Sequence, residues 1–207
     1  MAGRFCRVDP LNPAVHGSDL HECLGAHDAD DGRWTYLPYG PFSGRAPFEQ
    51  WLDDVTRSDD PLFHTIVNGG GSAVGLVAYM RIDRANGVIE LGHLNFSRAL
   101  QRTAAATETI YLLMRRAFDE LGYRRCEWKC DSLNEPSRRA AERLGFTYEG
   151  LFRQAVVYKQ RNRDTAWYAV TDAEWPRLKG AFEAWLAPEN FDSGGRQRRT
   201  LSACLRT

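Results

Sequence analysis

The sequence predicts an α/β fold in which one mixed sheet, mostly antiparallel, carries helices on both faces. Three observations predict it. Tight-turn signals join three strand-like segments in the middle of the chain, an amphipathic helix pattern follows the third segment, and strands and helices alternate after it. A chain of 207 residues fits one such domain with short extensions.

Two helices are expected before the first of these strands. Residues 1–17 are expected to form an extended lead-in, and a helix is predicted over residues 18–25, from a Ser-Asp start to a glycine stop. Residues 26–45 are rich in Gly, Pro and Asp and predict a loop, which is unusually aromatic. A proline suits the first turn of a second helix, predicted over residues 47–57.

Three antiparallel strands are predicted next, at residues 63–67, 74–82 and 88–96. The glycine run at residues 69–71 predicts the first connection, and Asn86-Gly87 is a strong hairpin signal for the second. Both connections are too short for a crossover, so the three strands should lie side by side in one sheet.

Helices and strands alternate in the second half. Apolar residues at helical spacing predict a helix from about residue 105 to Gly122. A strand is predicted at residues 125–130, parallel to the strand at 88–96, because a helix crosses between them. Asn134 suits the N-cap of the next helix, which ends at Gly145. The last elements are expected to be two strands and a helix, at residues 147–152, 165–171 and 172–186.

The charge balance argues against a polyanionic partner. The chain has 27 basic and 27 acidic residues, so neither nucleic acid nor an anionic membrane is attracted to its whole surface. No apolar run long enough to span a membrane is present. Arginines gather near the C-terminus, and we expect one domain over residues 1–188 and an Arg-rich tail over residues 189–207. Nucleic-acid binding by that tail is the alternative, and it would depend steeply on salt.

Cysteine usage indicates a reducing compartment. No CxxC pair is present, so neither a zinc ribbon nor a redox motif is visible, and no metal is expected. The N-terminal residues lack the apolar core of a signal peptide. A cytoplasmic location is therefore expected. The five cysteines are Cys6, Cys23, Cys126, Cys130 and Cys204.

A run of small residues opens the helix that follows the strand at 88–96. Ala104, Ala105 and Ala106 leave its backbone open to close approach. The first N–H groups of a helix have no intrahelical partner and lie at the positive end of its dipole, so such a turn can hold a phosphate. An ordinary alanine-rich helix start is the alternative interpretation.

Two motifs together carry a family resemblance. Gln101-Arg102-Thr103-Ala104-Ala105-Ala106 resembles the Q/R-x-x-G-x-G/A acyl-CoA loop of the GNAT superfamily of N-acetyltransferases, with Ala104 where glycine is usual. Asn134 to Ser137, and then Arg143-Leu144-Gly145-Phe146, are similar to the family's N-x-x-S and K/R-x-G-F pattern. The resemblance covers residues 5–187 and is closest to the ribosomal-protein-alanine N-acetyltransferases. Because alanine does not adopt positive φ cheaply, Ala104 should have helical or extended dihedrals.

The resemblance implies a GNAT acyl-CoA N-acyltransferase fold, whose central parallel strands splay apart and admit the pantetheine arm of acetyl-CoA, the co-substrate. Leu94 and Phe96 would lie along that arm, the loop would hold the pyrophosphate, and Asn134 and Ser137 would lie across the gap. Arg102, Arg138, Arg139 and Arg143 could meet the nucleotide phosphates, with solvated surface charges as the alternative. The cofactor-binding candidates are Leu94, Phe96, Gln101, Arg102, Thr103, Ala104, Ala105, Ala106, Thr107, Asn134 and Ser137.

The catalytic candidates are Glu90, His93 and Ser137. Glu90 and His93 are candidate general bases, and strand alternation predicts that they point to opposite faces of the sheet. Their alternative roles are an ion-pair partner and a polar group on the sheet. Many GNAT enzymes protonate the leaving thiolate with a tyrosine, but the matching position here is Ala141, so Ser137 is the nearest hydroxyl.

The resemblance implies an N-acetyltransferase that moves an acetyl group directly to a primary amine in a ternary complex, since no cysteine lies at an evident nucleophile position. The amine could belong to a peptide N-terminus, an amino acid or a small molecule. The protein could be a monomer or a homodimer. Trp34, Tyr36 and Tyr39 could form the acceptor pocket, with packing as their alternative role. A non-catalytic acyl-CoA-binding module is the rival function, and the missing tyrosine supports it.

Overall fold

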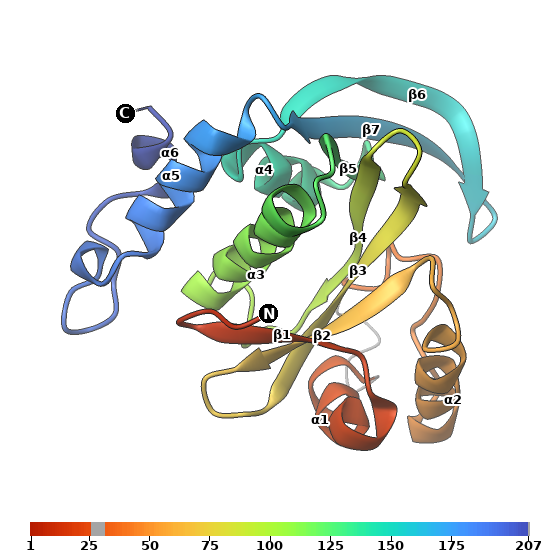
Figure 1. Ribbon diagram of the computed structural model, residues 1–207. Coiled ribbons are helices and arrows are strands. Elements are labelled where there is room, and N and C mark those ends of the chain that lie inside the picture. The colour runs from red at the N-terminus through yellow and green to blue at the C-terminus, as the bar shows by residue number, and fades with distance from the viewer. Residues whose placement is uncertain (26–31, 207) are drawn as a thin grey trace.

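A single seven-stranded sheet forms the centre of the computed structural model, which describes residues 1–25 and 32–206 (Figure 1). The strand order is β1-β2-β3-β4-β5-β7-β6, and β4 and β5 are its one parallel pair of neighbours in the described residues. The mixed, mostly antiparallel sheet predicted from the sequence is confirmed. The strands are β1 (Cys6–Pro10), β2 (Leu62–Asn68), β3 (Ala73–Asp83), β4 (Val88–Phe96), β5 (Arg125–Asp131), β6 (Thr147–Tyr158) and β7 (Arg161–Thr171).

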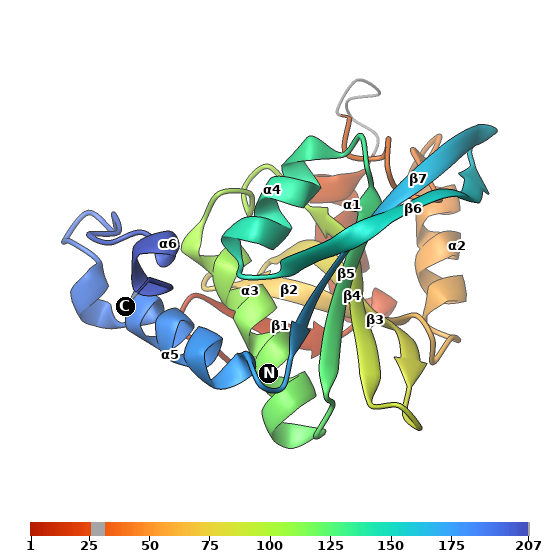
Figure 2. The ribbon, with the colours of Figure 1, turned by 90° about the horizontal axis from the view of Figure 1, so that it is seen from above.

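Helices cover both faces of the sheet, as expected (Figure 2). A main core joins one sheet face to α3, α4 and α5, and a second core joins the other face to α1 and α2. No helix in the described part of the chain is both long and apolar enough to cross a bilayer. The helices are α1 (Pro13–Leu24), α2 (Arg45–Val55), α3 (Ala104–Arg115) with its π-helical extension η1 (Arg116–Glu120), α4 (Glu135–Arg143), α5 (Trp175–Leu186), the 3-10 turn η2 (Pro188–Asn190) and α6 (Leu201–Cys204).

The N-terminal segment differs from the expected extended lead-in and late helix start. It forms β1, in which Val8 is fully buried opposite Ile66 of β2. Helix α1 then begins at Pro13, because the Asn12 side chain accepts a hydrogen bond from the Ala14 backbone N–H at 3.1 Å and caps the helix. The predicted start at residue 18 was wrong, since an Asn-Pro cap preceded the Ser-Asp pair.

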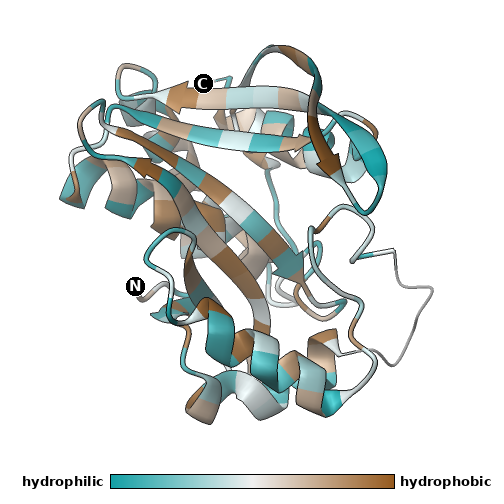
Figure 3. Cartoon of the chain, turned by 90° about the vertical axis from the view of Figure 1, so that its right-hand side faces the viewer, coloured by the Kyte–Doolittle hydropathy of each residue, from teal (hydrophilic) through white to brown (hydrophobic). Residues whose placement is uncertain are grey.

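The β6–β7 hairpin is much longer than predicted. Its strands meet at a turn where Lys159 and Gln160 have φ of 47° and 60°, the left-handed conformation of tight hairpin turns. The turn and the start of β7 are hydrophilic in Figure 3, whereas β6 carries the apolar residues Val156 and Val157 near its end. β6 is an edge strand and most of it is exposed. Its far end therefore shows no alternation of apolar and polar residues, and the sequence predicted a shorter strand.

The segment predicted as an Arg-rich tail lies against α5 up to residue 206. Leu201 and Cys204 of α6 are buried in the main core. The Asn190 side chain donates to the backbone oxygens of Trp185 and Arg199, at 2.8 and 3.2 Å. Packing therefore holds these residues on the domain, and a count of charges could not reveal it. The domain boundary at residue 188 stays a prediction.

Candidate active site

Strands β4 and β5 part after three residue pairs. Residues 88–90 of β4 pair with residues 125–127 of β5, and no further pair joins the two strands in the described sheet. Both strands continue, β4 to Phe96 and β5 to Asp131. Backbone N–H and C=O groups along this opening are therefore left for another partner.

A cavity of about 1240 Å³ occupies the region of the opening. The end of β4 and the start of α3 line one side, and β5 and α4 line the other. Residues after α5 close one end, and the loop before α2 lies at the other. Of the candidates from the sequence, the cavity is lined by Tyr36, Leu94, Phe96, Gln101, Arg102, Thr103, Ala104, Thr107, Asn134, Ser137, Arg139 and Arg143.

The start of α3 has the geometry of an anion site. Thr103 caps it: the Oγ1 atom accepts from the Ala106 N–H at 3.2 Å and donates to the Leu100 carbonyl at 2.7 Å. The left-handed residue is Arg102, with φ of 61°, and Ala104 is the first helical residue. The expected dihedrals at Ala104 are confirmed, and glycine is not needed there because the positive φ falls two residues earlier.

The other two alanines of the loop do not line the cavity. Ala105 and Ala106 pack against the main core. The Ala105 carbonyl accepts from the Thr109 hydroxyl at 2.9 Å. The Ala105 backbone N–H remains available to a phosphate, whereas the Ala106 N–H is taken by the Thr103 cap.

Side chains brace the two walls of the cavity. Gln101 Nε2 donates to the Phe96 carbonyl at 2.9 Å and fixes the end of β4. Arg143 of α4 donates to Thr107 Oγ1 of α3 at 3.0 Å, and burial lowers the pKa of this guanidinium. Arg138 lies elsewhere, because its Nε donates to the Tyr168 hydroxyl at 3.3 Å.

The N-terminus of α4 presents Asn134 and Ser137 to the cavity. Asn134 Oδ1 accepts from the Ser137 N–H at 3.2 Å, so the predicted N-cap is confirmed. Ser137 Oγ accepts from Trp128 Nε1 at 3.0 Å. Because indole N–H is only a donor, the Ser137 hydroxyl keeps its own proton to donate.

Glu90 does not reach the cavity. It is 4% exposed, and its carboxylate lies between Lys129 Nζ at 3.1 Å and Arg81 Nε at 3.2 Å. Burial raises the pKa of the Glu90 carboxyl, and the nearby Lys129 ammonium opposes that rise. The geometry gives Glu90 the ion-pair role.

A β-bulge puts His93 on the same face of the sheet as Glu90. Two residues of β4, His93 and Leu94, stand opposite one residue of β3, and His93 has φ of 51°. Leu94 consequently packs against the main core, while the His93 ring stacks on Tyr39 at 5.5 Å in the second core. The predicted opposite faces were wrong, because the extra residue breaks the alternation.

His93 is a neutral base candidate beside the cavity rather than in its lining. Its ring also contacts Phe63, with centroids 4.9 Å apart. Burial, and then the positive charge of Arg163, lower the pKa of His93 to about 4. The imidazole is therefore uncharged near neutral pH.

The structure separates the three aromatic candidates. Tyr36 lines the cavity, and its hydroxyl donates to the Leu133 carbonyl at 2.9 Å. Trp34 is 4% exposed and meets Tyr39 edge to face in the second core. Trp34 and Tyr39 therefore pack in the second core and do not line the cavity.

Sequence reasoning missed several lining residues. Asn95 stands between Leu94 and Phe96 in an apolar strand, and that polar break was an available signal. The lining residues near the C-terminus gave no signal in the sequence, because only the fold brings them to the cavity. The missed residues include Arg33, Asn95, Trp128, Trp185, Phe191, Arg196 and Gln197. Across residues 1–25 and 32–206, no group of three or more His, Cys, Asp or Glu side chains could hold a metal ion.

Comparisons with known proteins agree with this geometry. Residues 11–147 match the model of the acetyltransferase (GNAT) domain family. A crystal structure of a GCN5-related N-acetyltransferase from Brucella melitensis is 51% identical, with a TM-score of 0.96 over 100% of this chain and 93% of that chain. A GNAT-family structure from Chromobacterium violaceum is 43% identical, with a TM-score of 0.78 over 84% of this chain and 87% of that one.

One relative supports the subfamily that the sequence resembles. A Bacillus subtilis protein with the provisional name ribosomal N-acetyltransferase YdaF is 25% identical over 151 residues, which are 70% of this chain and 79% of that protein.

Proposed function

The chain belongs to the GNAT acetyltransferase family, and on that premise we propose that it transfers an acetyl group from acetyl-CoA to a primary amine in a ternary complex. The observation that carries this proposal is the cavity at the parted strands β4 and β5, beside the N-terminus of α3. Five free cysteines suit a reducing compartment, so we expect the reaction in the cytoplasm.

The residues present fit acetyl-CoA. Free N–H groups at the start of α3 suit the pyrophosphate, and Arg102 adds positive charge at the cavity wall, where Arg139 is paired with Glu135. Backbone groups at Leu94 and Phe96, which β5 does not pair, suit the amide groups of the pantetheine arm. The amide nitrogen of Asn134 is a donor on the opposite wall.

When bound, acetyl-CoA would supply an acetyl thioester. Transfer forms a C–N bond to the acceptor nitrogen, which loses a proton, and breaks the C–S bond, which releases CoA as its thiol. The Ser137 hydroxyl donates a hydrogen bond to the departing sulfur, because Trp128 already occupies an acceptor site of its oxygen, and the proton removed from the amine reaches the sulfur through solvent. His93 is the neutral base that removes the proton from the amine, directly or through a water.

Direct transfer is favoured over a cysteine intermediate. Cys130 lies on β5 near Ser137, but it does not line the cavity. Burial raises the pKa of its thiol, with the Ser137 hydroxyl opposing that rise, so the thiolate is scarce near neutral pH.

Thiol release from acetyl-CoA tests the proposal. A panel of peptide N-termini, amino acids, polyamines and aminoglycosides is offered, and product masses are measured. Acetylated product and thiol release above the rate without acceptor are expected for at least one class. A protein that binds acetyl-CoA in calorimetry but acetylates no amine would instead be the non-catalytic acyl-CoA-binding module.

A further inference from the structure

Unpartnered polar atoms gather on the sheet face that carries α1 and α2, next to the parted strands. Five buried atoms there have no hydrogen-bond partner among the described residues: Tyr39 Oη, His93 Nδ1, both amide atoms of Asn95, and Thr165 Oγ1. Arg163 Nε is a sixth. Buried polar groups are nearly always paired in native proteins, so this cluster indicates a ligand that supplies the missing partners.

The register places these side chains on one face. Asn95 stands opposite Leu76, which lies in the second core, so it points to the side of α1 and α2. Thr165 stands opposite Asp131, while their neighbours Ala166 and Cys130 point into the main core. Alternation along β7 then puts Arg163 on the same face as Thr165.

Asn95 connects this face with the acetyl-CoA cavity. Its side chain is on the second-core side of the sheet and is 2% exposed, yet it lines the same cavity as Trp128, which lies in the main core. Asn95 therefore stands at the edge of the cavity, on the part of β4 that β5 no longer pairs. An amine at Asn95 would meet a thioester that enters from the other side.

Among residues 1–25 and 32–206, Arg163 is a cation without a paired carboxylate. The two nearest carboxylates in sequence and sheet are engaged: Asp131 accepts from the Tyr158 hydroxyl at 2.7 Å and pairs with Arg161, and Asp164 accepts from the Gln154 N–H at 2.8 Å. Arg163 has no ion pair in the described part of the chain. Its positive charge adds to the burial that lowers the pKa of His93, and alternation along β7 puts Arg163 on the sheet face that carries His93.

The chemistry of the missing partners is mixed. Arg163 and the Thr165 hydroxyl offer donors, one of them charged, which suits a carboxylate. Asn95 Oδ1 and neutral His93 offer acceptors, which suit the N–H groups of an amine. We propose that the acceptor is an amine that also carries a carboxylate, with Arg163 holding the carboxylate and Asn95 the amino group. This inference rests on the proposed acetyl transfer.

Matched acceptors test the inference in the wild-type protein. A free amino acid is compared with its primary amide, and an acidic peptide N-terminus with an uncharged one, which separates the two sources of the carboxylate. At least tenfold higher kcat/KM for one carboxylate-bearing amine over its neutral match is expected, since a charged hydrogen bond contributes about 1.5–3 kcal/mol, or roughly 10- to 150-fold. Equal or lower kcat/KM for every carboxylate-bearing amine overturns it.

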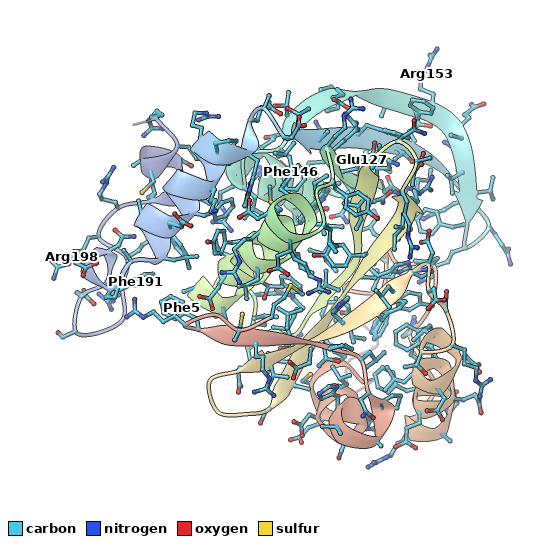
Figure 4. All side chains as sticks on the ribbon, in the orientation of Figure 1. Phe5, Glu127, Phe146, Arg153, Phe191 and Arg198 are labelled. Atoms are coloured by element: carbon cyan, nitrogen blue, oxygen red, sulfur yellow. The ribbon has the colours of Figure 1, made fainter. Side chains whose placement is uncertain are left out.

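Arg163→Gln tests the residue. The variant should raise KM for the carboxylate-bearing acceptor at least tenfold, with little change for the neutral match and in acetyl-CoA affinity. Arg163→Lys should restore part of the loss. Arg153→Gln is the control, because Arg153 is exposed on β6 and points away from the fold (Figure 4). An equal loss for both acceptors overturns the role of Arg163.

Failure of the proposed function gives a different result. If no amine is acetylated, acetyl transfer is contradicted, and melting of the CoA complex decides the inference. Stabilisation by a carboxylate-bearing amine but not by its neutral match supports it in the wild-type protein. Equal stabilisation, or none from either member of each pair, overturns it.

Discussion

Ser137 lines the cavity, and its Oγ accepts a hydrogen bond from Trp128 Nε1, so its own proton remains available to another acceptor. In the proposed reaction, this hydroxyl takes the role of the tyrosine that the sequence lacks at Ala141. A free thiol has a pKa of about 8.5, so the help that a proton donor gives to a leaving thiolate should be largest at low pH.

Ser137→Ala should therefore lower kcat at pH 7 by roughly 10- to 100-fold, at or below the usual range for general acid catalysis. The loss should shrink as the pH rises past about 8.5, because the thiolate then leaves unaided. A pH profile of kcat measures it, with the exposed Ser72→Ala as control. A loss that is constant across the pH range would show that Ser137 only positions Trp128.

Asn134 caps α4, and the proposed function gives its amide a second role as a donor to the cofactor. Asn134→Asp keeps the capping oxygen but replaces the amide donor with an acceptor. The free protein should melt nearly as before, while acetyl-CoA affinity falls by about 5- to 150-fold.

The matched control for Asn134 is Asn12→Asp, which makes the same change at the cap of α1. Asn12 does not line the cavity, so CoA affinity should stay unchanged there. Calorimetry with CoA and thermal melting measure both variants. Native CoA affinity in Asn134→Asp would limit that residue to capping.

At the scale of elements, the bulge in β4 and the start of α3 decide where the site lies. The bulge interrupts the regular pairing of β4 with β3 and turns His93 and Leu94 to opposite cores. The turn before α3 then aims free N–H groups at the cavity, with Arg102 in the left-handed conformation and Thr103 as cap.

Ala104→Asp should weaken acetyl-CoA binding at least tenfold, because the carboxylate would stand at the position proposed for the pyrophosphate. An acidic residue in the first turn favours the helix itself, so the free protein should remain folded. Ala104→Ser adds a polar group of similar size without charge and serves as control. Binding measured at low and high salt should show the defect shrinking at high salt. Unchanged affinity would place the pyrophosphate elsewhere.

At the scale of the whole molecule, two cores on opposite faces of one sheet bury imidazoles that would be charged in an unfolded chain at mildly acidic pH. Burial lowers the pKa of His64 to about 4, and His64 is 6% exposed. His93 has a pKa of about 4 for the same reason. As pH falls below about 6.5, the unfolded state binds these protons first.

The free energy of unfolding should accordingly decrease between about pH 6.5 and 4, by up to about 3 kcal/mol for each histidine. His64→Leu should reduce this dependence by the share of His64, because one of the two groups that titrate is gone. Urea unfolding across that pH range measures it. A stability profile with the same slope in the variant would contradict the assignment to His64.

The order of elements and the family could be predicted from local signals. The Asn86-Gly87 turn, the helical spacing before Gly122 and the Asn134 cap each depend on neighbouring residues, and the structure confirms the elements they predicted. The hairpin end at residues 153–164 and the strand at Cys6–Pro10 were missed, because exposed edge strands carry weak apolar periodicity.

The sequence by itself determined the mixed sheet, its one parallel pair and the two motifs at α3 and α4, since backbone propensity and short-range spacing are written in consecutive residues. Only the tertiary structure decided that Glu90 is enclosed by Lys129 and Arg81, that Leu201 holds the C-terminal segment on the domain, and that Asn95 and Arg163 lie on one face of the sheet. One extra residue in β4 reverses the face of every side chain after it, and contacts between residues far apart in the chain leave no local pattern.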